Sequence, residues 1–324
     1  MSLFDDVRGA AARVVQHARS VRIDAAALAA LASQLRIDPP PPPSWDPVAY
    51  HVGTPATRLA YGITLDAINF GSGWFPKLRK RAGRSGYYTV ALGLKDRFDA
   101  HGPWSAAELS VLTATDLAET TGQTLTDPDV AELMALFARA LNDLGRLLAE
   151  HHGGSFEALV ADAGGSAERL VRSLARMPLY RDVSWYEGPA GARFAVPFYK
   201  RAQITVADLA IAFGGAGPGR FDDLDALTCF ADNLVPHVLR CAGVLDYAPA
   251  LAARIAAEQL LPPGAPEEVE IRAAGVHAVE QLVAALRATG TPASAHQIDM
   301  TLWHRGQRPE IKARPRHRSR CPYY

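Results

Sequence analysis

Apolar residues recur at helical spacing along most of the chain, and the clearest stretch is TDPDVAELMALFARALNDLGRLLAEHH (residues 126–152). Pro128 suits the first turn of a helix, where its missing N–H has no partner to lose. The apolar positions that follow form one helical stripe: Val130, Leu133, Leu136, Phe137, Leu141, Leu144 and Leu147. This pattern predicts a long amphipathic helix with one buried face.

Capping signals mark the starts of other helices. Asp24 is a candidate N-cap ahead of AAALAALASQLR, and Ser105 to Glu108 form a capping box ahead of LSVLTATDLAE. Thr205 is a candidate cap in the same sense. Further helices are expected at 166–176, 205–213, 224–232, 235–243, 247–260, 267–288 and 295–303. The chain is therefore predicted to be mainly α-helical, a multi-helix bundle.

Strand signals are sparse. VSWYEG and ARFAVPF alternate bulky residues around GPAG, which predicts one short β-hairpin at roughly 183–197. The run Pro39–Pro43 must be extended and is expected to separate an N-terminal helical arm with its Pro-rich connector, residues 1–45, from a body at 46–324. The body is expected to be catalytic and to consist of two intimately packed subdomains.

Composition narrows the function classes. The chain has 324 residues, with 34 basic and 34 acidic side chains, so no overall field draws it to nucleic acid or membrane. No run of eighteen uncharged apolar residues exists, and a cytoplasmic protein without a membrane span is expected. The three cysteines have no C-x-x-C or His/Cys ligand spacing, so structural zinc is not predicted. No other metal and no cofactor is expected.

One acid stands in an unexpected place. In CFADNLVPH, Asp232 lies between Phe230 and Val235, in a segment otherwise suited to a core helix, and Pro236 follows almost at once. An aspartate in such apolar surroundings loses much of its hydration and needs a partner or a task. Pro236 is expected to start a new helix and to fix the geometry of the junction.

Three further clusters pair polar or charged groups with aromatic rings. Taken singly, each has a plain interpretation: a cap, a satisfied core pair, or exposed charges entering a helix. Together they suggest one pocket that stacks a flat ring and hydrogen-bonds to its polar edge. The clusters are Asp66, Asn69, Phe70 and Trp74; Phe198, Tyr199, Lys200 and Arg201; and Asp299, Trp303 and Arg305.

The stretches LDAINFGSGWF, PFYKRAQI, LTCFADNLVPHVLRCAGVLDY, IDMTLWHRG and the ending RPRHRSRCPYY together resemble the queuosine salvage proteins, the queuosine 5'-phosphate N-glycosylase/hydrolases. The resemblance runs in family order from about Asp46 onward. It implies a fold similar to the helix-hairpin-helix DNA glycosylases and release of queuine from queuosine 5'-phosphate, a step of queuine salvage for tRNA modification. By motif, the catalytic aspartate falls on Asp232 and the active-site lysine on Lys200.

This activity gives the buried acid a physical task. Cleavage of an N-glycosidic bond builds positive charge on the sugar, which a carboxylate in a low-dielectric pocket stabilises while it orients water. Lys200 would keep Asp232 ionised or hold the phosphate, for which Arg201 and the basic tail are further candidates. Phe70 is the preferred stacking partner for the base. The expected substrate-binding residues are His51, Asp66, Asn69, Phe70, Gly71, Ser72, Phe198, Tyr199, Arg201, Asn233, Asp299, Trp303 and Arg305.

Two other classes of function stay open at this point. A helix-hairpin-helix nucleic-acid-binding protein without catalysis would use GGAGPG and the basic tail on phosphates. Zero net charge counts against it, and no stable nucleic-acid binding is expected. A helical scaffold with merely satisfied buried acids is the other class, and a tight complex with queuine would exclude it.

Overall fold

The computed structural model describes residues 2–35, 45–188 and 191–324, and these residues are mainly helical. They divide into two compact units that each draw on separate stretches of sequence. Unit 1 contains the described residues of Met1–Pro40, Asp182–Lys200 and Asp225–Arg320. Unit 2 contains those of Pro41–Arg181, Arg201–Leu224 and Cys321–Tyr324.

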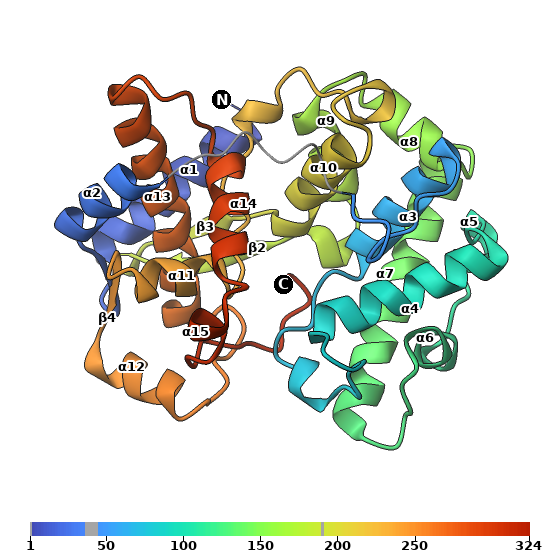
Figure 1. The fold of residues 1–324 in the computed structure, drawn as a ribbon, viewed down its shortest axis with the longest axis horizontal. Coiled ribbons are helices and arrows are strands. Elements are labelled where there is room, and N and C mark those ends of the chain that lie inside the picture. The colour runs from blue at the N-terminus through green and yellow to red at the C-terminus, as the bar shows by residue number, and fades with distance from the viewer. Residues whose placement is uncertain (1, 36–44, 189–190) are drawn as a thin grey trace. The chain divides into compact units, whose positions relative to one another are not determined.

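Unit 1 is organised around α13 (Pro266–Ala288), most of whose side chains are buried. This helix packs against α1 (Leu3–His17), α2 (Ala25–Gln34), α11 (Val235–Cys241) and α14 (Ala295–Arg305), as Figure 1 shows. The short helices α12 (Pro249–Ala256) and α15 (Pro309–Lys312) complete the helices of the unit. Helices thus cover α13 on several faces, which accounts for its burial along nearly its whole length.

Two small antiparallel sheets belong to unit 1. β2 (Val183–Glu187) pairs with β3 (Arg193–Pro197), with Trp185 opposite Ala195, so the predicted hairpin is confirmed. β1 (Val21–Ile23) pairs with β4 (Leu245–Tyr247), which the sequence did not predict. Strands of three residues are too short for a period-two pattern to stand out.

Unit 2 is organised around α7 (Pro128–His151), the long amphipathic helix expected from the sequence. It packs against α3 (Pro55–Ala67), α5 (Ala106–Leu109), α6 (Ala114–Thr121) and α8 (Phe156–Asp162). The remaining elements are α4 (Gly86–His101), α9 (Ala167–Leu174), α10 (Lys200–Ala212, in unit 2 from Arg201 onward) and the 3-10 turns η1 (Phe75–Lys77), η2 (Pro178–Tyr180) and η4 (Gly217–Gly219).

A glycine permits the contact between α5 and α7. A Cβ added at Gly145 would lie 2.6 Å from the carbonyl oxygen of Ala106 and 2.5 Å from the Ser110 hydroxyl. Real Cβ atoms do not approach backbone so closely, so a side chain here would push the two helices apart. The predicted apolar stripe of α7 is buried apart from Leu136, which is half-buried.

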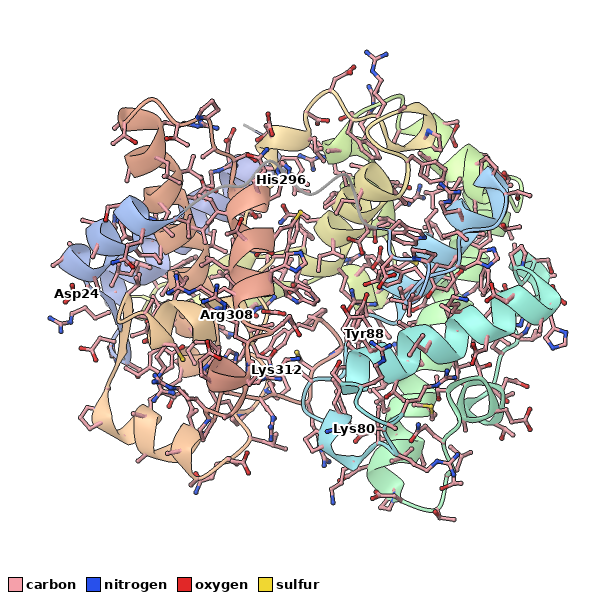
Figure 2. The ribbon with its side chains drawn as sticks, in the orientation of Figure 1. Asp24, Lys80, Tyr88, His296, Arg308 and Lys312 are labelled. Atoms are coloured by element: carbon pink, nitrogen blue, oxygen red, sulfur yellow. The ribbon has the colours of Figure 1, made fainter. Side chains whose placement is uncertain are left out.

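The predicted caps are mostly confirmed. Asp24 caps α2, because its Oδ1 accepts a hydrogen bond from the Ala27 amide at 2.8 Å (Figure 2). The capping box from Ser105 to Glu108 is present, although α5 is only four residues long and a second capping box, at Thr113, starts α6. Each cap satisfies an amide that a helix start leaves without an intrahelical partner.

Two helix predictions are wrong. Thr205 is not a cap, because α10 already begins at Lys200, whose amide donates to Asp182 Oδ2 at 3.1 Å. Of the predicted helix at 224–232, only Leu224–Ala226 form a 3-10 turn, and the following residues up to Leu234 are irregular. In both segments, the backbone forms hydrogen bonds with residues far away in sequence.

The run Pro39–Pro43 lies outside the described residues, and the boundary predicted near residue 45 stays a prediction. Among the described helices, none combines the length and the hydrophobicity that crossing a membrane requires.

Candidate active site

Asp232 lies in unit 1, three residues before Val235, where α11 begins. Its Oδ1 accepts hydrogen bonds from the amides of Leu234 at 2.6 Å and Val235 at 3.1 Å. These amides lie where a helix start leaves donors without intrahelical partners. Pro236 stands in the first turn of α11, as predicted. The half-buried Asp232 carboxylate is thus held in one orientation by the start of the helix.

A second acid, Asp299 on α14, lies within electrostatic range of Asp232. Its Oδ1 accepts hydrogen bonds from the Phe230 amide at 2.9 Å and from the Cys229 thiol at 3.1 Å. Burial, and then the charge of Asp232, raise the pKa of Asp299 to about 7, while the Lys200 ammonium acts in the opposite direction. Near neutral pH the Asp299 carboxyl is therefore divided between its protonated and ionised forms.

This raised pKa predicts how stability depends on pH. Between about pH 5 and pH 7 the folded Asp299 keeps a proton that the unfolded residue has lost, so the free energy of unfolding falls as pH rises through this range. The variant Asp299→Asn lacks this proton. Its stability relative to the parent should rise with pH by up to about 1.4 kcal/mol per unit and level off above about pH 7. Urea unfolding of both proteins at pH 5, 6, 7 and 8 measures this difference, and a constant difference would contradict the assignment.

Lys200 is buried and follows a strained residue. Only 4% of its surface is exposed, and Tyr199 immediately before it has φ of +50°. Residues other than glycine rarely adopt this backbone conformation, and such strain persists only where surrounding contacts enforce it. The backbone carbonyl of Asp182 accepts hydrogen bonds from the amides of Phe198 at 2.9 Å and Tyr199 at 3.3 Å. The interpretation of Lys200 as an exposed charge entering a helix is therefore wrong.

The Asp182–Arg272 ion pair is a part of this region that the sequence analysis missed. Arg272 on α13 donates from Nη1 and Nη2 to the two carboxylate oxygens of Asp182, at 3.0 and 2.6 Å. Both side chains are buried. The sequence did contain a signal for this pair. Arg272 lies in EVEIRAAGVHAV as a charged residue within an apolar helix, just as Asp232 is a charged residue within an apolar segment.

The other predicted residues of unit 1 differ in burial. Asn233 is 6% exposed, and its Nδ2 has no hydrogen-bond partner within the part of the chain that the structure describes. Phe198 is buried beneath the Arg272 guanidinium, 3.9 Å from its ring centroid. Trp303 and Arg305 are half-buried on α14. Asn233 thus offers a buried donor directly beside Asp232.

The remaining predicted residues lie in unit 2. Asp66 is in the last turn of α3, and Asn69, which lies beyond the helix, donates from Nδ2 to Asp66 Oδ1 at 3.4 Å. Gly71 and Ser72 donate their amides to the carbonyl of Tyr324, at 3.1 and 3.5 Å. The structure therefore brings Asp66 and Asn69 of the first cluster together, although the helix does not extend to Asn69.

His51 has protein partners at both ring nitrogens. Its Nδ1 lies 2.6 Å from Asp99 Oδ1, and its Nε2 lies 2.9 Å from Thr57 Oγ1. A substrate contact through either nitrogen would therefore compete with an existing hydrogen bond.

Arg201 and Phe70 form a packed cluster in unit 2. The Arg201 guanidinium lies over the ring of Phe70, at 4.6 Å, and over that of Tyr180, at 4.4 Å, and it donates to the carbonyls of Ala67 and Leu179. Phe70 is 1% exposed and meets the Phe137 ring edge-on at 5.1 Å. Arg201 is thus buried rather than an exposed charge, and base stacking by Phe70 stays a prediction.

Comparison with known proteins adds a further line of evidence. Residues 50–324 match the family described as "Queuosine salvage protein". A protein of Sphaerobacter thermophilus named queuosine 5'-phosphate N-glycosylase/hydrolase is 39% identical over 317 residues, covering 96% of this chain and 95% of its own. Proteins with the same name from Dictyostelium discoideum, at 33% identity, and Bos taurus, at 34%, cover 82% and 74% of this chain and 77% and 72% of their own.

Proposed function

Since the chain belongs to the queuosine salvage protein family, we propose that it hydrolyses the N-glycosidic bond of queuosine 5'-phosphate and releases queuine, with the Asp232 carboxylate facing the reacting sugar. The observation that carries the role of Asp232 is its geometry. One oxygen is fixed by two backbone amides, and the charge of the group acts on the buried acid Asp299, on which the buried Lys200 ammonium also acts. Such a preorganised charge needs no rearrangement when the reaction develops charge opposite to it.

The carboxylate acts on the sugar. As the bond to the base breaks, positive charge spreads over the anomeric carbon and the ring oxygen, and the negative charge of Asp232 stabilises this state. The same carboxylate can orient water and accept its proton as the water attacks. Both roles need an ionised group in a fixed position, which the start of α11 provides.

The departure of queuine needs different protein contacts from those that assist the departure of guanine. Queuine has carbon at the position of N7, so protonation there cannot assist its departure. We infer that Asn233 Nδ2 donates to the ring edge and that Asp299 faces the cationic aminomethyl arm. A buried donor without a protein partner is costly unless a ligand satisfies it, which supports the proposal for Asn233.

The 5'-phosphate needs cations near Asp232. Lys200 is one candidate, because its charge acts on Asp299, on which the charge of Asp232 also acts. Arg316, from the basic tail, is a second candidate: the charge of Asp232 acts on it, and its Nε has no hydrogen-bond partner among the described residues. The contacts of Arg201 with two carbonyls and two rings favour a structural role for that residue.

Incubation with queuosine 5'-phosphate tests the activity. Chromatography should show free queuine and ribose 5-phosphate accumulating in equal amounts, with many turnovers per protein molecule. Folded protein that releases no queuine would overturn the proposal. Binding of tRNA or DNA with a steep salt dependence, in place of turnover, would support the nucleic-acid-binding alternative.

Proton release tests the contact between Asp299 and the base. A cation beside Asp299 favours its ionised form, so queuine binding near pH 7 should expel part of the proton that Asp299 holds in the unliganded protein. Calorimetry in buffers of different ionisation enthalpy measures this proton. Asp299→Asn should release less and should discriminate less between queuine and guanine. Equal proton release from parent and variant would place the arm elsewhere.

We further propose a cytoplasmic protein without stable nucleic-acid binding and with a fold similar to the helix-hairpin-helix DNA glycosylases. The support for this is the balanced charge, the helical architecture and the family membership.

A further inference from the structure

Arg272 is fully buried, and its guanidinium contacts several other residues. From the middle of α13 its Nε donates to the carbonyl of Ala231 at 2.9 Å, and its other nitrogens pair with Asp182. Its guanidinium lies over the ring of Phe198, 3.9 Å from the centroid, and it is 3.5 Å from Glu268. This one side chain therefore connects α13 with the segments that precede Asp232 and Lys200.

We propose that Arg272 and Asp182 are positioning residues for the hydrolysis, setting the places of Asp232 and Lys200 by holding the backbone beside each; this inference rests on the proposed roles of those two residues. On the Asp232 side, the hydrogen bond from Arg272 fixes the carbonyl of the peptide that joins Ala231 to Asp232. The segment from 227 to 234 is irregular, so it has no helix or strand of its own to hold that peptide.

On the Lys200 side, Asp182 provides the link. Its Oδ2 accepts the Lys200 amide, and its backbone carbonyl accepts the amides of Phe198 and Tyr199. These bonds hold the turn in which Tyr199 adopts φ of +50°. Local strain of this kind relaxes when its supporting contacts are removed. Loss of the ion pair would thus displace Lys200 without removing its charge.

The energetics favour a task for the pair other than stability. Burying two charges costs several kcal/mol per ion, and well-packed apolar residues often do as well or better for stability. The planar guanidinium of an arginine instead donates to several acceptors in fixed directions and so orients them relative to one another. An apolar side chain or a lysine cannot reproduce this. Displacement of a reacting group by about 1 Å can cost about a hundredfold in rate.

The test compares variants of the full chain in the queuosine 5'-phosphate assay. Arg272→Lys and Asp182→Asn should each lower kcat about tenfold or more, with KM within a fewfold of the parent. The double variant Asp182→Asn/Arg272→Met removes both charges together and leaves neither partner of this pair as an unpaired ion. It should fold, by circular dichroism and thermal melting, and still be slow.

Glu270→Gln is the matched control. Glu270 lies on the same helix and is also buried, but it accepts hydrogen bonds from the amides of Arg19, Ser20 and Val21 and from the hydroxyl of Tyr186. Its kcat per folded molecule should equal that of the parent, whatever its melting temperature. If the Arg272 and Asp182 variants lose activity only in proportion to their unfolded fraction, or if the folded double variant turns over as the parent does, the pair is merely structural.

Asp232→Asn in the same assay separates this inference from the proposed function. If Asp232→Asn stays active, the proposed role of Asp232 fails and this inference fails with it. If Asp232→Asn is inactive while Arg272→Lys keeps its kcat, only the positioning role fails. In the Asp232→Asn background, Arg272→Lys should cost less than it does in the parent, because the group that it positions has lost its charge.

Discussion

Asp232→Asn is expected to lower kcat for queuosine 5'-phosphate hydrolysis by about a hundredfold to a thousandfold, the loss seen when one preorganised electrostatic group is removed from an active site. The amide oxygen can still accept from Leu234 and Val235, so the start of α11 should keep its shape. Queuine binding and the melting temperature should therefore change little. Steady-state kinetics, calorimetry with queuine and thermal melting measure the three quantities.

Asp24→Asn is the control for this substitution. Asp24 also accepts a backbone amide near the start of a helix, and Asn is an equally good cap, so kcat should be unchanged. A fully active Asp232→Asn would assign the chemistry to another acid, and Asp299 and Asp66 are the next to test.

Lys200→Met should lower kcat/KM for queuosine 5'-phosphate by about tenfold to a hundredfold, because a hydrogen bond to a charged group contributes about 1.5 to 3 kcal/mol. Methionine keeps most of the buried aliphatic stem but removes the ammonium. If Lys200 holds the phosphate, the nucleoside without phosphate should react slowly with the parent and no more slowly with the variant.

Lys80→Met removes an exposed lysine of unit 2 and serves as the control (Figure 2). Its kinetics should match those of the parent with both substrates. An equal loss for nucleotide and nucleoside in Lys200→Met would instead assign Lys200 to the ionisation of Asp232, and unchanged kinetics would remove it from the site.

Local signals predicted those parts of the fold that local contacts determine. The stripe and Pro128 of α7, the cap at Asp24 and the hairpin at 183–197 all depend on residues close together in sequence, and the structure confirms each. The helix predicted at 224–232 failed for the opposite reason. Asp299 accepts the amide of Phe230, and Arg272 donates to the carbonyl of Ala231, so partners 69 and 41 residues away hold this backbone in an irregular path.

The same difference between local and long-range contacts applies to the candidate site. Asp232 and Asp299 stood out because an acid in apolar sequence is unusual wherever it occurs. Asp182 and Arg272 did not stand out, because their importance lies in bonding to each other and to segments near 199 and 231. Likewise, the sequence could not show that the Arg201 guanidinium contacts the rings of both Phe70 and Tyr180. Resemblance to a family pointed to the acid and the lysine as candidates, whereas the structure shows which contacts hold them.

The role of the Asp232 charge is tested most directly by a cationic mimic of the reacting sugar. A pyrrolidinium analogue of ribose 5-phosphate carries the positive charge that the transition state develops, and calorimetry can measure its affinity for the parent and for Asp232→Asn. We expect the variant to lose affinity for this cation by a factor similar to its loss in kcat/KM, while both proteins bind queuine equally. Equal affinity of the two proteins for the cation would contradict the proposed role of the Asp232 charge.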